Sequence, residues 1–518
     1  MLELQNRIRK KSLCTKIMPV DETIPFFKNG MYLGLSGFAT ANPKIIPAAL
    51  AEHVEKNRLQ GKMRFTVYTG ASMGRDIEDR WAGLQMLNGR APWLASNMSR
   101  KRINSGETWM TDTHLSKFAQ DFRNGFHPLN KNGKIDLAVI EASGITEDGG
   151  IVLTSDVGMS FEYILMAEKI IIEINTAIPS FEGLHDIYVT DSLPYKTPIP
   201  ISQIDDRIGS SFVPCDTEKI IAIVESKELG SGKPQPPSGE NEKIIASHIL
   251  DFFKFEVKNG RLPANLLPLQ SGVGAIANAV FGGLATGPFE HLRIWTEVMQ
   301  DTTLDLMDAG KLDFVSGTSF TLSDIGRERF YKNFEKYTDK LVLRPTHISN
   351  HAEMIRRFQV IAMNTPIEFD IYAKANSSLL GGSNIVGGIG GSGEFLRNAY
   401  LSMMHSPSTR PTKTDPTGIS CVLPLVTHVD QTEHDMDIFV TEQGVADVRG
   451  LCPKDRAKVI INKCAHPDYQ PILKDYCDRA AKECLAKGAG HEPHMLFKVF
   501  NMQKNLAEKG TMKIDSWD

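Results

Sequence analysis

The chain has 518 residues, of which 41% are hydrophobic and 23% charged, a composition typical of a globular protein with two or more domains. Its 58 basic and 62 acidic residues give a net charge of −4, so we expect no nucleic-acid partner. The seven cysteines form no CxxC pair, which favours a reducing compartment over a disulfide scaffold or a zinc ribbon. No apolar run approaches the length of a membrane span, and we expect no membrane segment.

The first 17 residues are mildly basic, with five Lys or Arg side chains against one acid, Glu3. A segment of this kind is either a weak mitochondrial presequence or a solvated first helix. Composition leaves both interpretations open.

The first half of the chain alternates strand-like and helix-like segments. A helix is predicted over 45–56, and strands are predicted over 31–38, 64–68, 134–141, 169–175 and 219–225. The last three strands are nearly continuous β-branched runs, typical of parallel strands buried on both faces. The alternation predicts βαβ units and therefore an α/β domain.

Residues 228–242, rich in Pro, Gly and Ser, are the best candidate linker. Beyond it the alternation resumes, with helices predicted over 243–259, 276–284, 453–465 and 471–488 and strands over 292–295, 340–343, 367–372, 421–426 and 437–440. We therefore predict an α/β protein of two domains with mostly parallel sheets. The predicted domains are residues 1–230 and 231–518, and the second carries most of the unusual sequence.

The most unusual stretch is GGSNIVGGIGGSGEF, residues 381–395, in which seven of the first thirteen positions are glycine. Ile385, Val386 and Ile389 give it apolar side chains to pack, unlike a flexible linker. With a strand predicted before it and a helix predicted over 395–403, its backbone N–H groups could approach an anion or a developing oxyanion. The alternative is a tight structural turn.

Two further features could carry chemistry. Glu297 follows the predicted strand 292–295, at a strand end of the kind where α/β proteins bind ligands; it could be a base, a nucleophile or an N-cap of the next helix. The small-residue turn 268–275 opens the helix over 276–284 and is either an anion site or a structural helix entry. Spacing alone favours the structural interpretation of Glu297 and favours neither interpretation of the turn.

Between His428 and Asp435 the chain gathers two histidines and three acidic residues, which suggests a metal site. The spacing is not HExxH and does not place both histidines on one helical face. A polar loop is the preferred interpretation, and we predict no metal site.

Several long motifs, in order, resemble the acetyl-CoA hydrolase/transferase family, which contains the succinyl-CoA:acetate CoA-transferases and the fungal enzymes long called acetyl-CoA hydrolases. The similarity covers nearly the whole chain. It is carried by GLSGFATANPKIIPAAL, YTGAS, LPLQSGVGAIANAV, WTEVMQDTTLDLMDAGKLDFVSGTS, ISNHAEMIRRF, GGIGGSGEFLRNAY and HVDQTEHDMDIFVTEQGVADVRGL, with SPSTRPTKTDPTGIS and NKCAHPDYQPIL similar to the fungal type.

The resemblance implies a fold of two CoA-transferase-type α/β domains, usually dimeric, with Glu297 as the nucleophile that forms a glutamyl-CoA thioester. Val273 and Gly391 would offer backbone N–H groups to acyl oxygens. Asn350 and Ser72 would hold or orient the active-site carboxylate. The residues implied to line the CoA site are Leu269, Gln270, Ser271, Gly272, Val273, Gly387, Gly391, Lys413 and Glu442.

We therefore predict a CoA-transferase that moves CoA between a short-chain acyl-CoA and acetate or succinate, with acetyl-CoA hydrolysis as the alternative. The Glu297 carboxylate, with an unperturbed pKa of about 4.3, is expected to be ionised at neutral pH without a base. Its attack on the acyl-CoA would give a mixed anhydride and CoA thiolate, and the thiolate would then form the glutamyl-CoA. N–H donors from the glycine loop would stabilise each oxyanion. CoA is a substrate here, and no cofactor is predicted.

Two other classes of protein remain as alternatives. The GxGxxG spacing of residues 388–393 matches that of a nucleotide-dependent dehydrogenase. Such an enzyme also needs a strand that ends in an acidic residue about twenty residues later, and this chain has none there. A ligand-sensing protein on the same fold would not depend on Glu297. From the resemblance we also expect a homodimer and a mitochondrial location, with the cytoplasm as the alternative.

Overall fold

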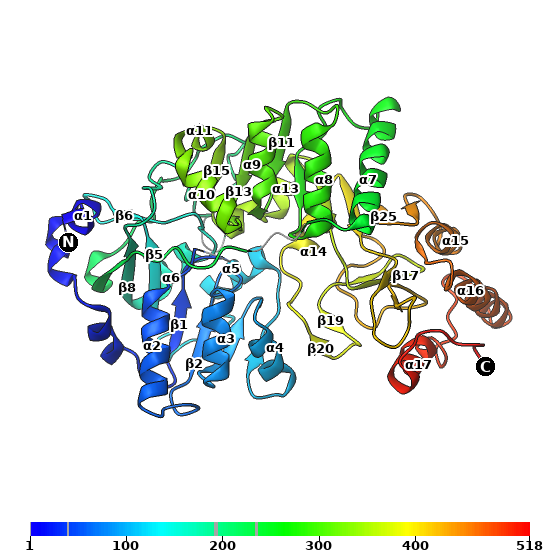
Figure 1. Ribbon diagram of the computed structural model, residues 1–518, viewed down its shortest axis with the longest axis horizontal. Coiled ribbons are helices and arrows are strands. Elements are labelled where there is room, and N and C mark those ends of the chain that lie inside the picture. The colour runs from blue at the N-terminus through cyan, green and yellow to red at the C-terminus, as the bar shows by residue number, and fades with distance from the viewer. Residues whose placement is uncertain (1, 39–40, 191–194, 234–236) are drawn as a thin grey trace. The chain divides into compact units, whose positions relative to one another are not determined.

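The structure is a computed structural model that describes residues 2–38, 41–190, 195–233 and 237–518 (Figure 1). These residues form two compact units, each assembled from segments that are separate in the sequence. The first unit contains Met1–Gln235, Arg293–Phe358 and Gly387–Glu394. The second contains Pro236–Leu292, Gln359–Val386 and Phe395–Asp518.

The first unit is built on a seven-stranded sheet in the order β4-β3-β2-β1-β5-β8-β9, in which every neighbouring pair is parallel. The strands are β1 (Tyr32–Leu35), β2 (Phe65–Tyr68), β3 (Leu87–Ala91), β4 (Trp109–Met110), β5 (Ile135–Ala142), β8 (Ala167–Asn175) and β9 (Ile220–Ser226). Helices of this part are α1 (Leu2–Arg7), α2 (Ile45–Lys56), α3 (Arg75–Gly83), α4 (Asn97–Asn104), α5 (Leu115–Arg123) and α6 (Ser160–Met166). The predicted parallel arrangement is confirmed.

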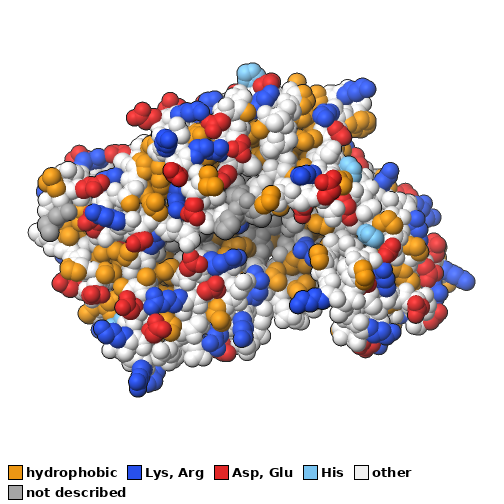
Figure 2. All heavy atoms as spheres, viewed as in Figure 1, with side chains coloured by type: hydrophobic (Ala, Val, Ile, Leu, Met, Phe, Trp, Pro, Cys, Tyr) orange, Lys and Arg blue, Asp and Glu red, His pale blue; other side chains and the backbone are white. Residues whose placement is uncertain are grey.

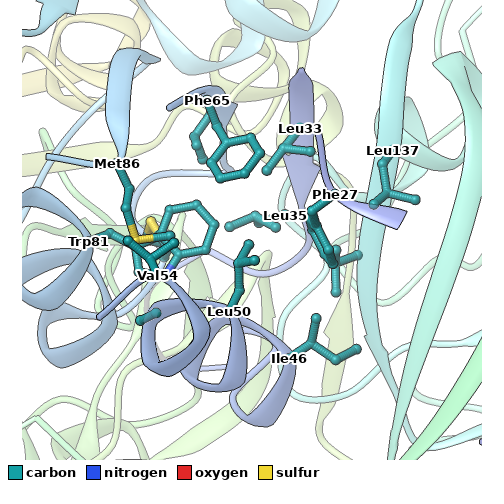
Figure 3. Close-up of a cluster of buried hydrophobic side chains, with 14 of the residues drawn as sticks. Phe27, Leu33, Leu35, Ile46, Leu50, Val54, Phe65, Trp81, Met86 and Leu137 are labelled. Atoms are coloured by element: carbon teal, nitrogen blue, oxygen red, sulfur yellow. The ribbon is translucent and has the colours of Figure 1, made fainter. Parts of the chain in front are cut away.

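Helix α2 shows how the local pattern builds this sheet's core. Ile46, Leu50 and Val54 recur every four residues, so they share one helical face, and all three are fully buried. They pack with Leu33 and Leu35 of β1 in one hydrophobic cluster (Figure 3). Burial of each such side chain contributes about 1.5–3 kcal/mol. Figure 1 shows α2 and α3 alongside β1 and β2.

The rest of the first unit follows β11 (Leu292–Trp295). Its strands are short and pair in parallel, β12 with β14 and β13 with β15. The elements are β12 (Val298–Met299), α9 (Asp301–Asp308), β13 (Leu312–Gly317), β14 (Ser319–Phe320), α10 (Asp324–Lys332), α11 (Phe334–Thr338), β15 (Leu341–Leu343), α12 (Thr346–Ser349) and α13 (Ala352–Arg357).

In the second unit β10, β16, β21 and β25 pair in parallel in that order, and β26 closes this group in the antiparallel sense. Its principal elements are α7 (Glu240–Lys258), β10 (Leu269–Ser271), α8 (Ala275–Thr286), β16 (Ile361–Asn364), β17 (Glu368–Asp370), β21 (Leu401–His405), β24 (Val422–Leu423), β25 (Ile438–Thr441), β26 (Gly444–Asp447), α15 (Pro453–Cys464), α16 (Gln470–Leu485) and α17 (Asn501–Lys509). The predicted α/β class with mostly parallel sheets is confirmed.

The helix predicted over 395–403 is wrong in its second half. Helix α14 (Ser392–Asn398) ends early, and β21 begins at Leu401. Leu401 to Met404 pair with β16, and Met403 to His405 pair with β25, so tertiary pairing overrides the helical preference of leucine and methionine. The glycine stretch begins inside a short hairpin, in the turn between β19 (Leu379–Leu380) and β20 (Asn384–Ile385).

The predicted domain boundary after residue 230 stays a prediction. In the packing units, Glu297 and Gly387–Glu394 are grouped with the N-terminal residues. The predicted linker 228–242 includes residues 234–236, which lie outside the described part of the chain, and α7 begins at its end, at Glu240.

Charged side chains of both signs are interspersed over the face drawn in Figure 2. Among the helices of the described residues, none combines the length and the apolar character needed to cross a membrane.

Candidate active site

Glu297 lies in the connection between β11 and β12 and is partly buried. Its backbone carbonyl accepts hydrogen bonds from the amides of Thr318 and Ser319, at 2.9 and 3.2 Å. These bonds fix the backbone of Glu297 beside the β12–β14 pair. The N-cap of the following helix α9 is Gln300, so the alternative interpretation of Glu297 as an N-cap is wrong.

The carboxyl group of Glu297 is held by Asn350, a fully buried residue directly after α12. Nδ2 of Asn350 donates to Oε2 of Glu297 at 2.6 Å, and it also donates to Oε2 of Glu394 at 3.0 Å. Oδ1 of Asn350 accepts from the Ser349 hydroxyl at 2.8 Å. One amide therefore connects two carboxyl groups.

Glu394 is the second carboxyl group of the site, and the sequence analysis did not identify it. It lies in the first turn of α14 and is 7% exposed. Its Oε1 accepts hydrogen bonds from the backbone amide of Ser116, at 2.9 Å, and from the Ser116 hydroxyl. The only sequence signal was its place at the end of the glycine stretch, since Ser116 lies 278 residues away.

Burial raises the pKa of Glu297 to about 8, opposed by the hydrogen bond from Asn350 and assisted by the charge of Glu394. Burial also raises the pKa of Glu394 to about 7, opposed by its bonds from Ser116 and Asn350. Withdrawal from water therefore favours the neutral acid of Glu297, and the ionisation of Glu297 at neutral pH stays a prediction.

Gly391 approaches the Glu297 carboxyl group more closely than any side chain could. A Cβ atom at position 391 would lie 1.9 Å from Oε2 of Glu297 and 2.5 Å from Nδ2 of Asn350. Glycine is required here by space, since its backbone is not in the positive-φ region. The predicted residues Glu297, Asn350 and Gly391 therefore lie together in the first unit.

The part of the glycine stretch from 387 to 394 is anchored by two segments of the seven-stranded part of the unit. The amide of Leu94 donates to the carbonyl of Gly387 at 3.0 Å, and the Trp93 indole donates to that of Gly388 at 3.2 Å. The Ile389 amide donates to both carboxylate oxygens of Asp112, at 3.0 and 3.1 Å. These contacts were not predicted, because their partners lie almost 300 residues apart in the sequence.

Ser72 is buried, and its hydroxyl donates to Oε2 of Glu78 at 2.9 Å. Glu78 forms a fully buried ion pair with Arg90, which also donates to the carbonyls of Ala71 and Trp93. This network orders the Ser72 turn and the backbone at Trp93. The predicted role of Ser72 in holding Glu297 stays a prediction.

The other predicted CoA-site residues belong to the second unit, except Gly387. Leu269, Gln270 and Ser271 form β10, and the Gln270 side chain exchanges hydrogen bonds with that of Asn364. Gly272 and Val273 follow in the turn before α8, and Val273 is 37% exposed. Lys413 is exposed, and Glu442 accepts from the amide of Ser408 at 2.8 Å. Their roles toward CoA stay predictions.

The loop from His428 to Asp435 forms local contacts within the second unit. His428 lies 3.2 Å from the carboxylate of Asp430, and His434 lies 3.6 Å from that of Glu433. Within the described ranges, no group of three or more His, Cys, Asp or Glu side chains is arranged to hold a metal ion. The absence of a metal from the reaction stays a prediction.

Chemically, the site combines a carboxyl group with an amide donor and a glycine backbone pressed against it. An ionised carboxylate is a nucleophile toward an activated carbonyl. N–H donors at fixed positions stabilise the negative charge that such an attack places on oxygen. The arrangement is therefore suited to acyl transfer through a covalent carboxyl intermediate.

Comparison with known proteins gives matches over almost the whole chain. The acetyl-CoA hydrolase/transferase N-terminal domain matches residues 1–225, and the C-terminal domain of that family matches residues 326–477. The acetyl-CoA hydrolase of Schizosaccharomyces pombe is 54% identical over 517 residues, covering 99% of both chains. That of Saccharomyces cerevisiae is 52% identical over 518 residues, covering 99% of this chain and 98% of its own.

Two solved structures share the fold. RipA from Yersinia pestis has a TM-score of 0.69 at 20% identity and covers 92% of this chain and 99% of its own. A 4-hydroxybutyrate CoA-transferase from Porphyromonas gingivalis has a TM-score of 0.62 at 18% identity, with 90% and 99% coverage. The architecture is therefore that of CoA-transferase-like proteins.

Proposed function

Because the chain belongs to the acetyl-CoA hydrolase/transferase family, we propose that it cleaves the thioester of acetyl-CoA with Glu297 as a covalent nucleophile and water as the final acceptor. The observation that carries the proposal is the packing of the Glu297 carboxyl group against Nδ2 of Asn350, at 2.6 Å, and against the backbone of Gly391. The names of the curated relatives support hydrolysis over the transfer reaction predicted from the sequence.

In this mechanism the ionised Glu297 carboxylate attacks the acetyl carbonyl, and the C–S bond breaks to give a mixed anhydride and CoA thiolate. The thiolate then attacks the glutamyl carbonyl of the anhydride, which releases acetate and leaves glutamyl-CoA. Water attacks the glutamyl-CoA and restores the glutamate, with CoA leaving as the thiol. In each addition the Asn350 amide and the Gly391 N–H group are the proposed donors to the developing negative charge.

Transfer to a carboxylate is the second candidate. The group that bonds Glu297 is the amide of Asn350, which cannot remove a proton from water, whereas an incoming acetate or succinate needs no deprotonation. This observation favours transfer. Both reactions share the steps to glutamyl-CoA and use CoA as a substrate rather than as a cofactor.

The test is intact-protein mass spectrometry after mixing with acetyl-CoA, followed by peptide mapping. We expect a CoA adduct on the Glu297 peptide in wild type and in Glu328→Gln, an exposed control on α10, but none in Glu297→Gln. Discharge of the adduct in water at the rate of turnover supports hydrolysis. Discharge only after addition of acetate or succinate supports transfer.

An adduct-free wild-type enzyme that turns over normally would contradict the covalent mechanism, as would full activity of Glu297→Gln. The homodimer and the mitochondrial location stay predictions from the resemblance.

A further inference from the structure

Glu394 is a buried carboxyl group that the proposed reaction does not use. Its two oxygens have different partners. Oε1 accepts from the amide and the hydroxyl of Ser116, at the start of α5, while Oε2 accepts from Nδ2 of Asn350 at 3.0 Å. One oxygen of the carboxylate is therefore hydrogen-bonded to the start of a helix, and the other is hydrogen-bonded to the residue that holds Glu297.

The amide of Asn350 has three polar positions, and all three are occupied. Its two N–H groups face two carboxyl groups, those of Glu297 and Glu394, and its carbonyl oxygen accepts from Ser349. Rotating this amide by half a turn would point its carbonyl oxygen at two acceptors, which is repulsive. The acceptor on the far side of Asn350 thus fixes which way the amide faces Glu297.

We propose that Glu394 is a positioning residue for the reaction of Glu297: it holds the Asn350 amide in the orientation that donates to the nucleophile. The inference rests on the proposed function, because it concerns the same nucleophile. Glu394 acts through Asn350 and has no assigned contact with acetyl-CoA.

A purely structural role would be to cap α5. The N-cap residue of α5, His114, supplies no side-chain hydrogen bond to the helix, and Glu394 provides a bond to the Ser116 amide from a distant part of the chain. The two bonds from Ser116 that serve this role both go to Oε1. The direction of Oε2 toward the buried Asn350 is the observation that a cap does not explain.

The charge of Glu394 also acts on the nucleophile, because it raises the pKa of Glu297. Removing that charge lowers the pKa of Glu297 and moves the acid limb of the activity profile to lower pH. The remaining titratable or charged groups on the elements around Glu394 are Asp112, His114, Lys117, Asp121 and Arg123 before and on α5, His347 and His351 on and after α12, and Arg397 on α14 itself.

The experiment measures kcat, KM and the pH dependence of acetyl-CoA cleavage in Glu394→Gln and Glu394→Asp. Glu394→Gln keeps the shape but places an amide against Asn350, and we expect kcat to fall about tenfold or more. KM for acetyl-CoA should stay within about twofold of wild type, and the acid limb should move to lower pH. Glu394→Asp shortens the side chain, so kcat should fall. Because it keeps the charge, the acid limb should not move.

The matched control is Glu353→Gln, which removes a carboxylate bonded to Arg357 on the neighbouring helix α13. It should leave kcat and the acid limb as in wild type. Thermal unfolding of each variant shows whether it is folded, and if Glu394→Gln is not, Glu394→Asp decides the question through kcat.

Wild-type kcat in folded Glu394→Gln, or in Glu394→Asp when it alone folds, would overturn the proposal. If the loss of activity is fully explained by the fraction of unfolded protein, and the acid limb of Glu394→Gln is unmoved, the proposal is overturned and Glu394 is only a helix cap. Failure of the proposed function is distinguishable, because the wild-type enzyme would then form no adduct on Glu297.

Discussion

The approach of Gly391 to Glu297 gives the sharpest prediction. In Gly391→Ala the added Cβ would lie 1.9 Å from Oε2 of Glu297, and Cβ atoms essentially never come within 3.0 Å of another heavy atom. The carboxylate oxygen therefore has to retreat by more than an ångström. The Asn350 amide has to move with it, because the same Cβ would lie 2.5 Å from Nδ2.

A misplacement of about 1 Å in a reacting group costs roughly a hundredfold in rate, or about 2.7 kcal/mol of transition-state stabilisation. We expect kcat of Gly391→Ala to fall by about that factor, with formation of the Glu297 adduct slowed equally. Overpacking of this kind lowers the free energy of unfolding by about 1–3 kcal/mol, against typical total stabilities of about 5–15 kcal/mol. The variant should therefore fold.

The assay is single-turnover release of CoA from acetyl-CoA, with urea unfolding of the same preparation. Gly83→Ala is the matched control, since Gly83 is exposed, lies at the end of α3 and has open space around its Cβ position. It should keep wild-type kcat and gain about 0.4–1 kcal/mol of stability. A kcat for folded Gly391→Ala within about twofold of wild type would refute the reasoning.

Two further predictions concern stability. Folding raises the pKa of Glu297 from 4.5 to about 8, so the folded state binds more protons and loses stability as pH rises through that window. The stability of Glu297→Gln relative to wild type should therefore increase toward pH 8. A difference in melting temperature between the two proteins that stays constant between about pH 4 and pH 8.5 contradicts this. Glu78→Gln leaves Arg90 without its buried partner and should lower the free energy of unfolding, measured in urea, by about 3–5 kcal/mol. Glu55→Gln, which breaks an exposed ion pair with Arg80, should lower it by less than about 1 kcal/mol. Similar losses in the two variants would contradict a stabilising role of the buried pair.

The sequence predicted elements best where one local pattern decided them. The β-branched runs at 134–141, 169–175 and 219–225 are parallel strands, and the predicted helix over 45–56 matches Ile45–Lys56. A strand buried on both faces must be apolar along its whole length, so its composition is informative. Residues 401–405 could not be predicted in this way. Leu and Met favour helices, and only the pairing with the neighbouring strands β16 and β25 makes this segment a strand.

The candidate site was predictable only in part. Glu297, Asn350 and Gly391 came from the resemblance of whole motifs, and spacing alone favoured the structural interpretation of Glu297. Glu394 was missed because its partner Ser116 lies 278 residues away. The raised pKa of Glu297 was also missed, since burial is a property of the folded chain and not of any motif.

The packing of Gly387–Glu394 into the first unit has a consequence for biosynthesis. This eight-residue segment belongs to a unit whose first 235 residues emerge from the ribosome long before it. Domains generally fold as units during synthesis, from the N-terminus onward, yet this one lacks its last segment until residue 394 of 518 has been made. Nascent chains therefore carry the partners of the glycine segment, Trp93, Asp112 and Ser116, before that segment exists, and the enzyme becomes competent only late in translation.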